Sequence, residues 1–139
     1  MPDQILPTQT FVLSVPDIDT IGQFSQCSGL EISFEMFEYA EGGNNDYVHK
    51  LPGRIQFPNL LLTRGLTNSE ALLKWFAQTK TQAQTKQITL TIKSGNDQRV
   101  FTFADAFPVR WTGPSFDATA MGLGTETLEV AHSGMTLPT

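Results

Sequence analysis

Apolar and polar residues alternate along most of this chain with a period of two, which is the pattern of β-strands that bury one face. The clearest case is residues 87–93, where Ile88, Leu90 and Ile92 alternate with polar residues. Residues 31–36 alternate in the same way, and we expect their apolar side to face a core. The same pattern, bounded by turn-forming residues, predicts further strands at 10–15, 23–28, 54–57, 60–64, 99–103, 107–111 and 125–131.

The alternation of 31–36 changes phase at Phe37–Tyr39, and we expect a β-bulge there because a bulge shifts the side-chain phase of a strand. Residues 40–53, which follow, are rich in Gly and Asn and predict a long loop. The loop ends in apolar residues that include Tyr47 and Leu51, which distinguishes it from a plain solvent-exposed linker.

One segment has the period of a helix. Residues Leu72, Trp75, Phe76 and Thr79 fall on one helical face, which we expect to pack on a sheet. The preceding residues, Thr67–Glu70, have the pattern of a capping box, in which a Thr hydroxyl and a Glu carboxylate bind backbone N–H groups of the first turn. The sequence therefore predicts a helix that begins next to Thr67.

Length and composition indicate one mainly β domain with one α-helix, a β-sandwich or barrel, over residues 1–139. The chain is 40% hydrophobic, too apolar for an intrinsically disordered chain. Its longest aliphatic run, Leu60–Leu62, is far shorter than the roughly 20 residues of a membrane-spanning helix. The N-terminal residues 1–5 lack the basic region of a secretory signal, so we expect cytoplasmic synthesis without a signal peptide. The single cysteine, Cys27, fits a reducing compartment and a buried thiol.

Charge is distributed unevenly around a net charge of −5. Residues 1–49 contain eight acidic residues and no Lys or Arg, residues 50–110 contain all nine basic residues and three acidic ones, and residues 111–139 contain three acidic ones. Either folding mixes these segments in space, or one molecule carries an acidic and a basic surface that attract each other between copies, head to tail. The negative net charge argues against nonspecific nucleic-acid binding, and we expect no specific nucleic-acid binding either.

The sequence contains no recognisable catalytic, cofactor or metal motif. His49 and His132 lack metal-ligand spacing, Cys27 has no neighbouring base, and the chain has no GxSxG, P-loop or GxGxxG pattern. Asp46 and His49 lie close in the chain, but no nucleophile accompanies them. We therefore expect no enzyme activity, no cofactor and no metal. A catalytic site assembled in space is the last of the alternatives.

Several stretches resemble one known family. The most specific are Gly42–Asp46 (GGNND) and Lys50–Arg54 (KLPGR). Shorter matches are Ser28–Leu30, Glu38–Glu41, Pro58–Leu60, Leu72–Phe76, Phe107–Pro114 and Thr125–Gly134. Together they cover nearly the whole chain and resemble the tail tube proteins of contractile-tailed phages. The resemblance is greatest to the inner-tube proteins of phage-tail-like contractile injection systems.

The resemblance implies a structural tube subunit with no catalytic site. Such subunits form hexameric rings, each with a continuous β-barrel around a hollow lumen and helices outside, which stack inside a contractile sheath. The implied partners are further copies of the chain, the sheath protein, baseplate or spike and cap proteins, and cargo in the lumen. The implied location is a phage-tail-like particle or virion assembled in the cell, with lysis as one route of release.

Other functions remain open at this point. Within the family, the alternative is an initiator or adaptor ring between tube and spike. From a different class, the alternative is a monomeric β-sandwich binding module. The sequence leaves open whether the particle is a phage or an injection system, and what its cargo and target are.

Two sets of residues are candidates for functional surfaces, one for contact between subunits and one for lining the lumen. The loop is the candidate subunit interface, because glycine permits close backbone approach and Asn and Asp side chains bind backbone groups. Its residues are Gly42, Gly43, Asn44, Asn45, Asp46, Tyr47, Lys50, Leu51 and Pro52. The polar positions of two alternating strands are candidates to face the lumen: Glu31, Ser33, Glu35, Gln87, Thr89, Thr91 and Lys93. The alternatives are a loop packed on its own domain and an ordinary solvent face.

Overall fold

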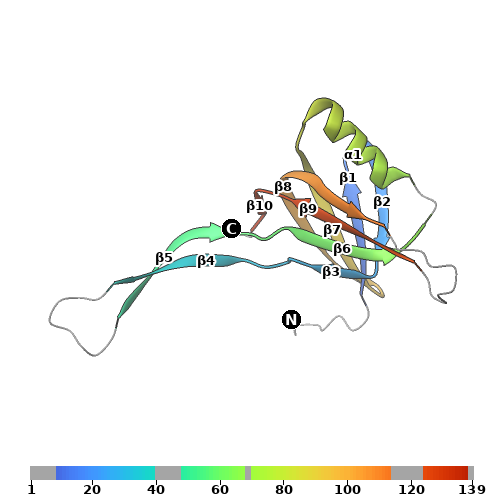
Figure 1. Ribbon diagram of the computed structural model, residues 1–139. Coiled ribbons are helices and arrows are strands. Elements are labelled where there is room, and N and C mark those ends of the chain that lie inside the picture. Colours follow the sequence, from blue (N-terminus) through green and yellow to red (C-terminus); the bar gives the residue numbers. More distant parts are fainter. Residues whose placement is uncertain (1–8, 40–47, 68–69, 114–123, 138–139) are drawn as a thin grey trace.

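A computed structural model describes residues 9–39, 48–67, 70–113 and 124–137, which form a mainly β body with one helix and a long two-stranded arm (Figure 1). The predicted fold class is confirmed. The elements are β1 (Thr10–Val15), β2 (Ile18–Phe24), β3 (Gln26–Ser28), β4 (Ser33–Tyr39), β5 (His49–Gln56), β6 (Leu60–Gly65), α1 (Ala71–Gln82), β7 (Lys86–Ser94), β8 (Asp97–Thr112), β9 (Thr125–Ala131) and β10 (Gly134–Met135).

The strands of the body follow the order β2-β1-β7-β8-β9-β6-β3, with antiparallel neighbours, and β10 pairs with β8 beside this path. The 16-residue β8 pairs with β7 through its first part and with β9 through its second. β2 and β3, the two ends of the path, are separated in the chain only by Ser25, so the single strand predicted over 23–28 is two. The backbone N–H of Ser25 donates to the Thr63 carbonyl on β6 at 2.9 Å. The sheet thus returns to its starting segment, and such closure removes free sheet edges.

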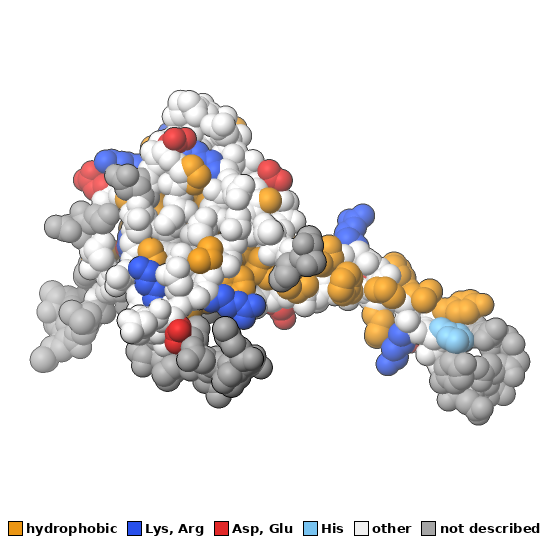
Figure 2. Space-filling view, turned by 180° about the vertical axis from the view of Figure 1, so that it is seen from behind, with side chains coloured by type: hydrophobic (Ala, Val, Ile, Leu, Met, Phe, Trp, Pro, Cys, Tyr) orange, Lys and Arg blue, Asp and Glu red, His pale blue; other side chains and the backbone are white. Residues whose placement is uncertain are grey.

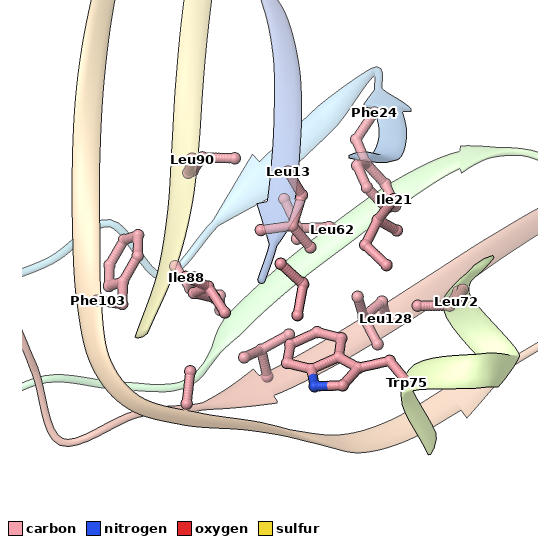
Figure 3. Packing of buried hydrophobic residues seen from close by; sticks show 14 of the residues in the cluster. Leu13, Ile21, Phe24, Leu62, Leu72, Trp75, Ile88, Leu90, Phe103 and Leu128 are labelled. Atoms are coloured by element: carbon pink, nitrogen blue, oxygen red, sulfur yellow. The ribbon is translucent and has the colours of Figure 1, made fainter. Parts of the chain in front are cut away.

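The apolar sides of the alternating strands form the core of this barrel (Figure 3). Ile88 and Leu90 on β7 and Leu128 on β9 are fully buried, as their alternation predicts. The helix contributes Leu72 and Trp75, and Trp75 is directed from α1 into the cluster. α1 lies against β2 and β8, so the expected packing of its apolar face on a sheet is confirmed.

The start of the helix differs from the prediction. α1 begins at Ala71 with Glu70 as its N-cap residue and no side-chain cap bond at that residue, so the predicted start next to Thr67 is wrong. The backbone N–H of Leu66 donates to the Gly124 carbonyl at 3.0 Å, next to the start of β9. Leu66 is thus bonded to the segment before β9, and the helix starts after it, at Ala71. Residues 68 and 69 lie outside the described residues.

The strongest departure from the sequence prediction is the arm formed by β4 and β5. These strands form a separate two-stranded sheet that projects from the barrel (Figure 1). Residues 49–53, predicted as loop, belong to β5. Ile32, Phe34 and Met36, predicted to face a core, are exposed. The alternation is real, but no other element covers the apolar side within the described chain.

Candidate functional site

The arm exposes more large apolar side chains than a soluble surface normally carries. All seven residues of β4 are exposed. Phe34, Met36, Phe37, Tyr39 and, from β5, Leu51 are each between 53% and 58% exposed. An isolated hairpin is only marginally stable in water, and contiguous exposed apolar groups mark contact surfaces. The arm therefore has the composition of an interface element.

The apolar residues of β4 and β5 form pairs across the arm. Near the barrel these pairs lie on one face of the two-stranded ribbon, and toward the tip they lie on the opposite face. Residues directly opposite each other in an antiparallel pair share a face. The pairs near the barrel are Phe34–Ile55 and Met36–Pro52, and those of the other face, toward the tip, are Phe37–Leu51 and Tyr39–His49. The rings of Tyr39 and His49 have centroids 5.9 Å apart.

The complementary half of each face is polar. Ser33 lies opposite Gln56 near the barrel, and Glu38 lies opposite Lys50 toward the tip. The Gln56 side-chain amide also donates to a carboxylate oxygen of Glu35 at 2.9 Å. Each face of the ribbon is therefore half apolar and half polar.

The change of face keeps the apolar residues together in space. A two-stranded ribbon twists strongly along its length, so one face does not point in one direction throughout. Figure 2 shows hydrophobic side chains along the arm, from the barrel to the tip, in a single view. We call this surface the apolar stripe; its residues are Phe34, Met36, Phe37, Tyr39, Leu51, Pro52 and Ile55.

The predicted bulge at 37–39 is wrong, because β4 keeps a regular register through these residues. The irregularity lies in β5, where Gly53 and Arg54 together oppose Glu35. A Cβ on Gly53 would lie 2.4 Å from the Phe37 ring, so only glycine fits beneath that ring. The alternation in the sequence thus changes phase at Phe37 because the apolar residues of β4 move from one face of the strand to the other. β4 can accommodate this change because neither of its faces packs on the barrel core.

Part of the predicted interface lies on the arm. Lys50, Leu51 and Pro52 are in β5, and the last two belong to the apolar stripe. Gly42, Gly43, Asn44, Asn45, Asp46 and Tyr47 lie outside the described residues.

The predicted lumen residues fall on two separate parts of the molecule. Ser33 and Glu35 lie on the arm, and Glu31 precedes it. The second group lies on the outer side of β7, on the opposite side from the buried Ile88 and Leu90. This group is Gln87, Thr89, Thr91 and Lys93. Its neighbours on β1 and β8 are mostly hydroxyl and amide side chains: Thr10, Val12, Ser14, Gln98, Val100 and Thr102. Lys93 is the one charged residue in this set.

Two buried charges between β6 and β9 were not predicted. Arg64 and Glu126 form an ion pair in the barrel wall, and the Trp111 indole donates to Glu126 at 2.9 Å. The sequence did indicate that Glu126 is buried, because Glu126 lies two and four residues before the buried Leu128 and Val130 and therefore on the same face of the strand. These contacts give the pair a structural role.

The Cys27 thiol and the possible metal ligands of the described residues bear on the expectations of no enzyme activity and no metal. Burial raises the pKa of the half-buried Cys27 thiol to about 11, so the thiol is protonated at neutral pH. Among the described residues, no group of three or more His, Cys, Asp or Glu side chains lies close enough to hold a metal ion. In the same part of the chain, no helix is long and apolar enough to cross a membrane.

Comparison with known proteins gives one family match. The model of the family described as T4-like virus tail tube protein gp19 matches residues 7–136. No match is found among curated proteins.

Solved structures include similar chains in contractile particles. A chain of the sheath-tube complex of PVC, an extracellular contractile injection system, in its extended state is 29% identical, with a TM-score of 0.76 and coverage of 95% of this chain and 90% of that chain. A chain of the tube terminating cap of the anti-feeding prophage (AFP) is 28% identical, with a TM-score of 0.78 and coverage of 98% and 92%. A chain of the AFP baseplate is 23% identical, with a TM-score of 0.77 and coverage of 98% and 95%, which shows the same fold.

Proposed function

This chain belongs to the T4-like virus tail tube protein gp19 family, and we propose that it assembles with copies of itself into stacked hexameric rings around a hollow lumen. It is a structural subunit of the inner tube of a contractile injection system or contractile tail. A tube subunit works through its contacts with other copies and needs no catalytic centre. The surface that makes those contacts is therefore the functional site.

The apolar stripe of the arm supports this proposal most directly. It projects from a barrel that already has its own core, so it adds little to the folding of the subunit. Covering it removes apolar surface from water, and each Å² of apolar surface that is buried stabilises the contact by about 25 cal/mol. We propose that the stripe of each subunit packs on the next copy. Such a head-to-tail contact closes into a ring when the rotation between copies allows it.

The partners and the place in the particle rest on the similar chains. Those chains come from complexes named for sheath and tube, cap, and baseplate. We propose the sheath protein, cap proteins and baseplate or spike proteins as partners of this chain. The chain of the sheath-tube complex is 29% identical over 95% of this chain, which supports a main tube subunit.

The outer face of β7 is our candidate for the lumen wall. It carries Gln87, Thr89, Thr91 and Lys93 on the barrel rather than on the arm, so the arm remains available for contact. Hydroxyl and amide side chains offer hydrogen bonds without strong charge, which suits a surface along which cargo passes. Attraction between acidic and basic surfaces of stacked rings stays a prediction, and it implies that salt weakens stacking.

The test is assembly of an arm variant. Phe37→Asp with Leu51→Asp places two charges in the apolar stripe. The matched control places two charges at the exposed end of α1 and in the linker that follows it, with Gln82→Asp and Gln84→Asp. We expect the parent and the control to form rings of six or tubes by negative-stain electron microscopy and native mass spectrometry. The arm variant should remain a folded monomer.

Two outcomes would count against the proposal. If the arm variant forms normal tubes, the stripe is not the contact between copies. If the parent remains monomeric at every concentration and is not incorporated when a cognate baseplate is added, self-assembly into a tube is wrong and the monomeric binding module is favoured.

A further inference from the structure

The arm leaves the barrel through two short linkers that lie in close contact. The first linker begins at Gly29, whose φ is 94°, and a Cβ there would lie 2.2 Å from the Asn59 carbonyl oxygen in the second. The side-chain amide of Asn59 donates to a carboxylate oxygen of Glu129 on β9 at 2.8 Å. The chain is therefore held against the barrel where it leaves the arm and enters β6.

The imidazole of His132 joins the second linker to the barrel core. Its ring centroid is 4.7 Å from that of Phe103, a fully buried residue of β8, and 5.9 Å from that of Phe57 in the linker. On the adjoining strand, a Cβ on Gly134 would lie 3.2 Å from the Phe57 ring. Phe57 is thus packed against both the imidazole and the backbone of β10.

Both ring nitrogens of His132 are shielded from solvent, and neither has a hydrogen-bond partner of normal geometry among the described residues. Burial lowers the pKa of His132 and outweighs the backbone groups of Pro58 and Gly134, which act in the opposite direction. The neutral imidazole is therefore the form that fits between the two phenylalanine rings.

No carboxylate contributes to the pKa shift of His132, whose causes are burial and the backbone of Pro58 and Gly134. On the elements that meet His132, Asp105 of β8 accepts a hydrogen bond from the Ser133 hydroxyl at 2.9 Å, and Glu129 of β9 accepts one from Asn59. The linker residues 57–59 and β10 carry no titratable side chain. A proton on His132 thus has no carboxylate counter-ion acting on it among the described residues.

We propose that His132 is the positioning residue that holds the root of the arm on the barrel, and that its protonation in acid releases the arm. This inference rests on the proposed role of the arm in contact between copies. A charged imidazole that is shielded from water and has no counter-ion is unfavourable, and the backbone groups of Pro58 and Gly134 offset only part of the cost of burial. The proton therefore favours a state in which the ring has left its place between Phe57 and Phe103.

The pH range follows from linkage. The pKa of His132 is lower in the folded chain than in the unfolded chain. The stability contributed by the neutral ring is therefore fully present above the unfolded value of about 6.5, and it is lost as the pH falls from there toward the folded value. Acidification below about pH 6 should loosen the arm before most carboxylates titrate.

Hydrogen exchange measures the root directly, without relying on assembly. We use the Phe37→Asp, Leu51→Asp background at a concentration where gel filtration shows a monomer. There we expect protection of a peptide spanning 55–60, corrected for intrinsic rates, to fall about threefold or more between about pH 7.5 and about pH 5.5. His132→Phe keeps an aromatic ring without a titrating group and should abolish the change. His49→Gln removes the other histidine of the chain and should leave the change intact.

The outcomes separate this inference from the proposed function. If the exchange protection of residues 55–60 does not depend on pH, or depends on pH equally in His132→Phe, the proposed role of His132 is wrong. This conclusion holds whether or not the chain assembles into tubes. If His132→Phe does not fold, the comparison of the parent with His49→Gln decides, because loss of the pH dependence in His49→Gln assigns it to His49. If the root loosens in acid while preformed parent tubes persist, His132 acts as inferred and the arm is not the contact between copies.

Discussion

Replacing Arg64 by methionine is expected to destabilise the barrel strongly, because it leaves a buried carboxylate without its counter-ion. Arg64 on β6 and Glu126 on β9 are each 5% exposed, and Nε of Arg64 lies 2.5 Å from a Glu126 oxygen. The guanidinium also donates to the Ile21 carbonyl at 2.9 Å and lies 4.8 Å from the centroid of the Phe24 ring. The Trp111 indole binds the other Glu126 oxygen. The pair thus connects β2, β6, β8 and β9.

The size of the effect follows from desolvation. Removing one partner of a buried ion pair costs about 3–5 kcal/mol, since the remaining charge stays buried. With a urea m-value of about 2 kcal/mol per M, a loss of about 4 kcal/mol lowers the unfolding midpoint by about 2 M. The double variant Arg64→Met, Glu126→Leu removes both charges and should cost less than the single variant, because an apolar pair often replaces a buried ion pair at little cost.

Urea unfolding followed by tryptophan fluorescence measures these changes, at a concentration where gel filtration shows a monomer. The control is Arg110→Met, an exposed residue on β8, for which we expect a change within about 0.5 kcal/mol. If Arg64→Met costs less than about 1 kcal/mol, or if the double variant is less stable than the single one, the argument from an unpaired buried charge is wrong.

Two further predictions concern the arm and the thiol. Gly53→Ala places a Cβ 2.4 Å from the Phe37 ring, so it should displace the ring from the apolar stripe. We expect assembly, measured by sedimentation, to weaken, while the urea midpoint for unfolding of the barrel stays unchanged. Gly65→Ala, whose Cβ meets nothing within 4 Å, is the control, and equal assembly of the two variants would contradict the role of Gly53. Because the pKa of Cys27 is raised from 9.0 to about 11, iodoacetamide at about pH 8 should label the folded chain about 100-fold more slowly than the chain in urea. Equal rates would show that the thiol is not shielded.

The sequence by itself determined the strands β1, β6, β7 and β9 of the barrel and the packed face of the helix. Burial of one strand face leaves a period of two in the sequence, and β7 and β9 bury the residues that this period selects. The helical spacing of Leu72 and Trp75 likewise identified the side of α1 that enters the core. These features are local, since a few consecutive residues are enough to show which face avoids water.

Only the tertiary structure decided which apolar faces are covered and which groups meet across the chain. The alternation in β4 has the same period as that in β7, yet β4 is exposed because it pairs with β5 alone. Arg64 and Glu126 are 62 residues apart, and His132 meets Phe57 and Phe103 only after the barrel closes. Hydrophobic periodicity records that a residue prefers burial, but its partner is set by strand order and register. The exposed arm and its root are therefore properties of the folded chain.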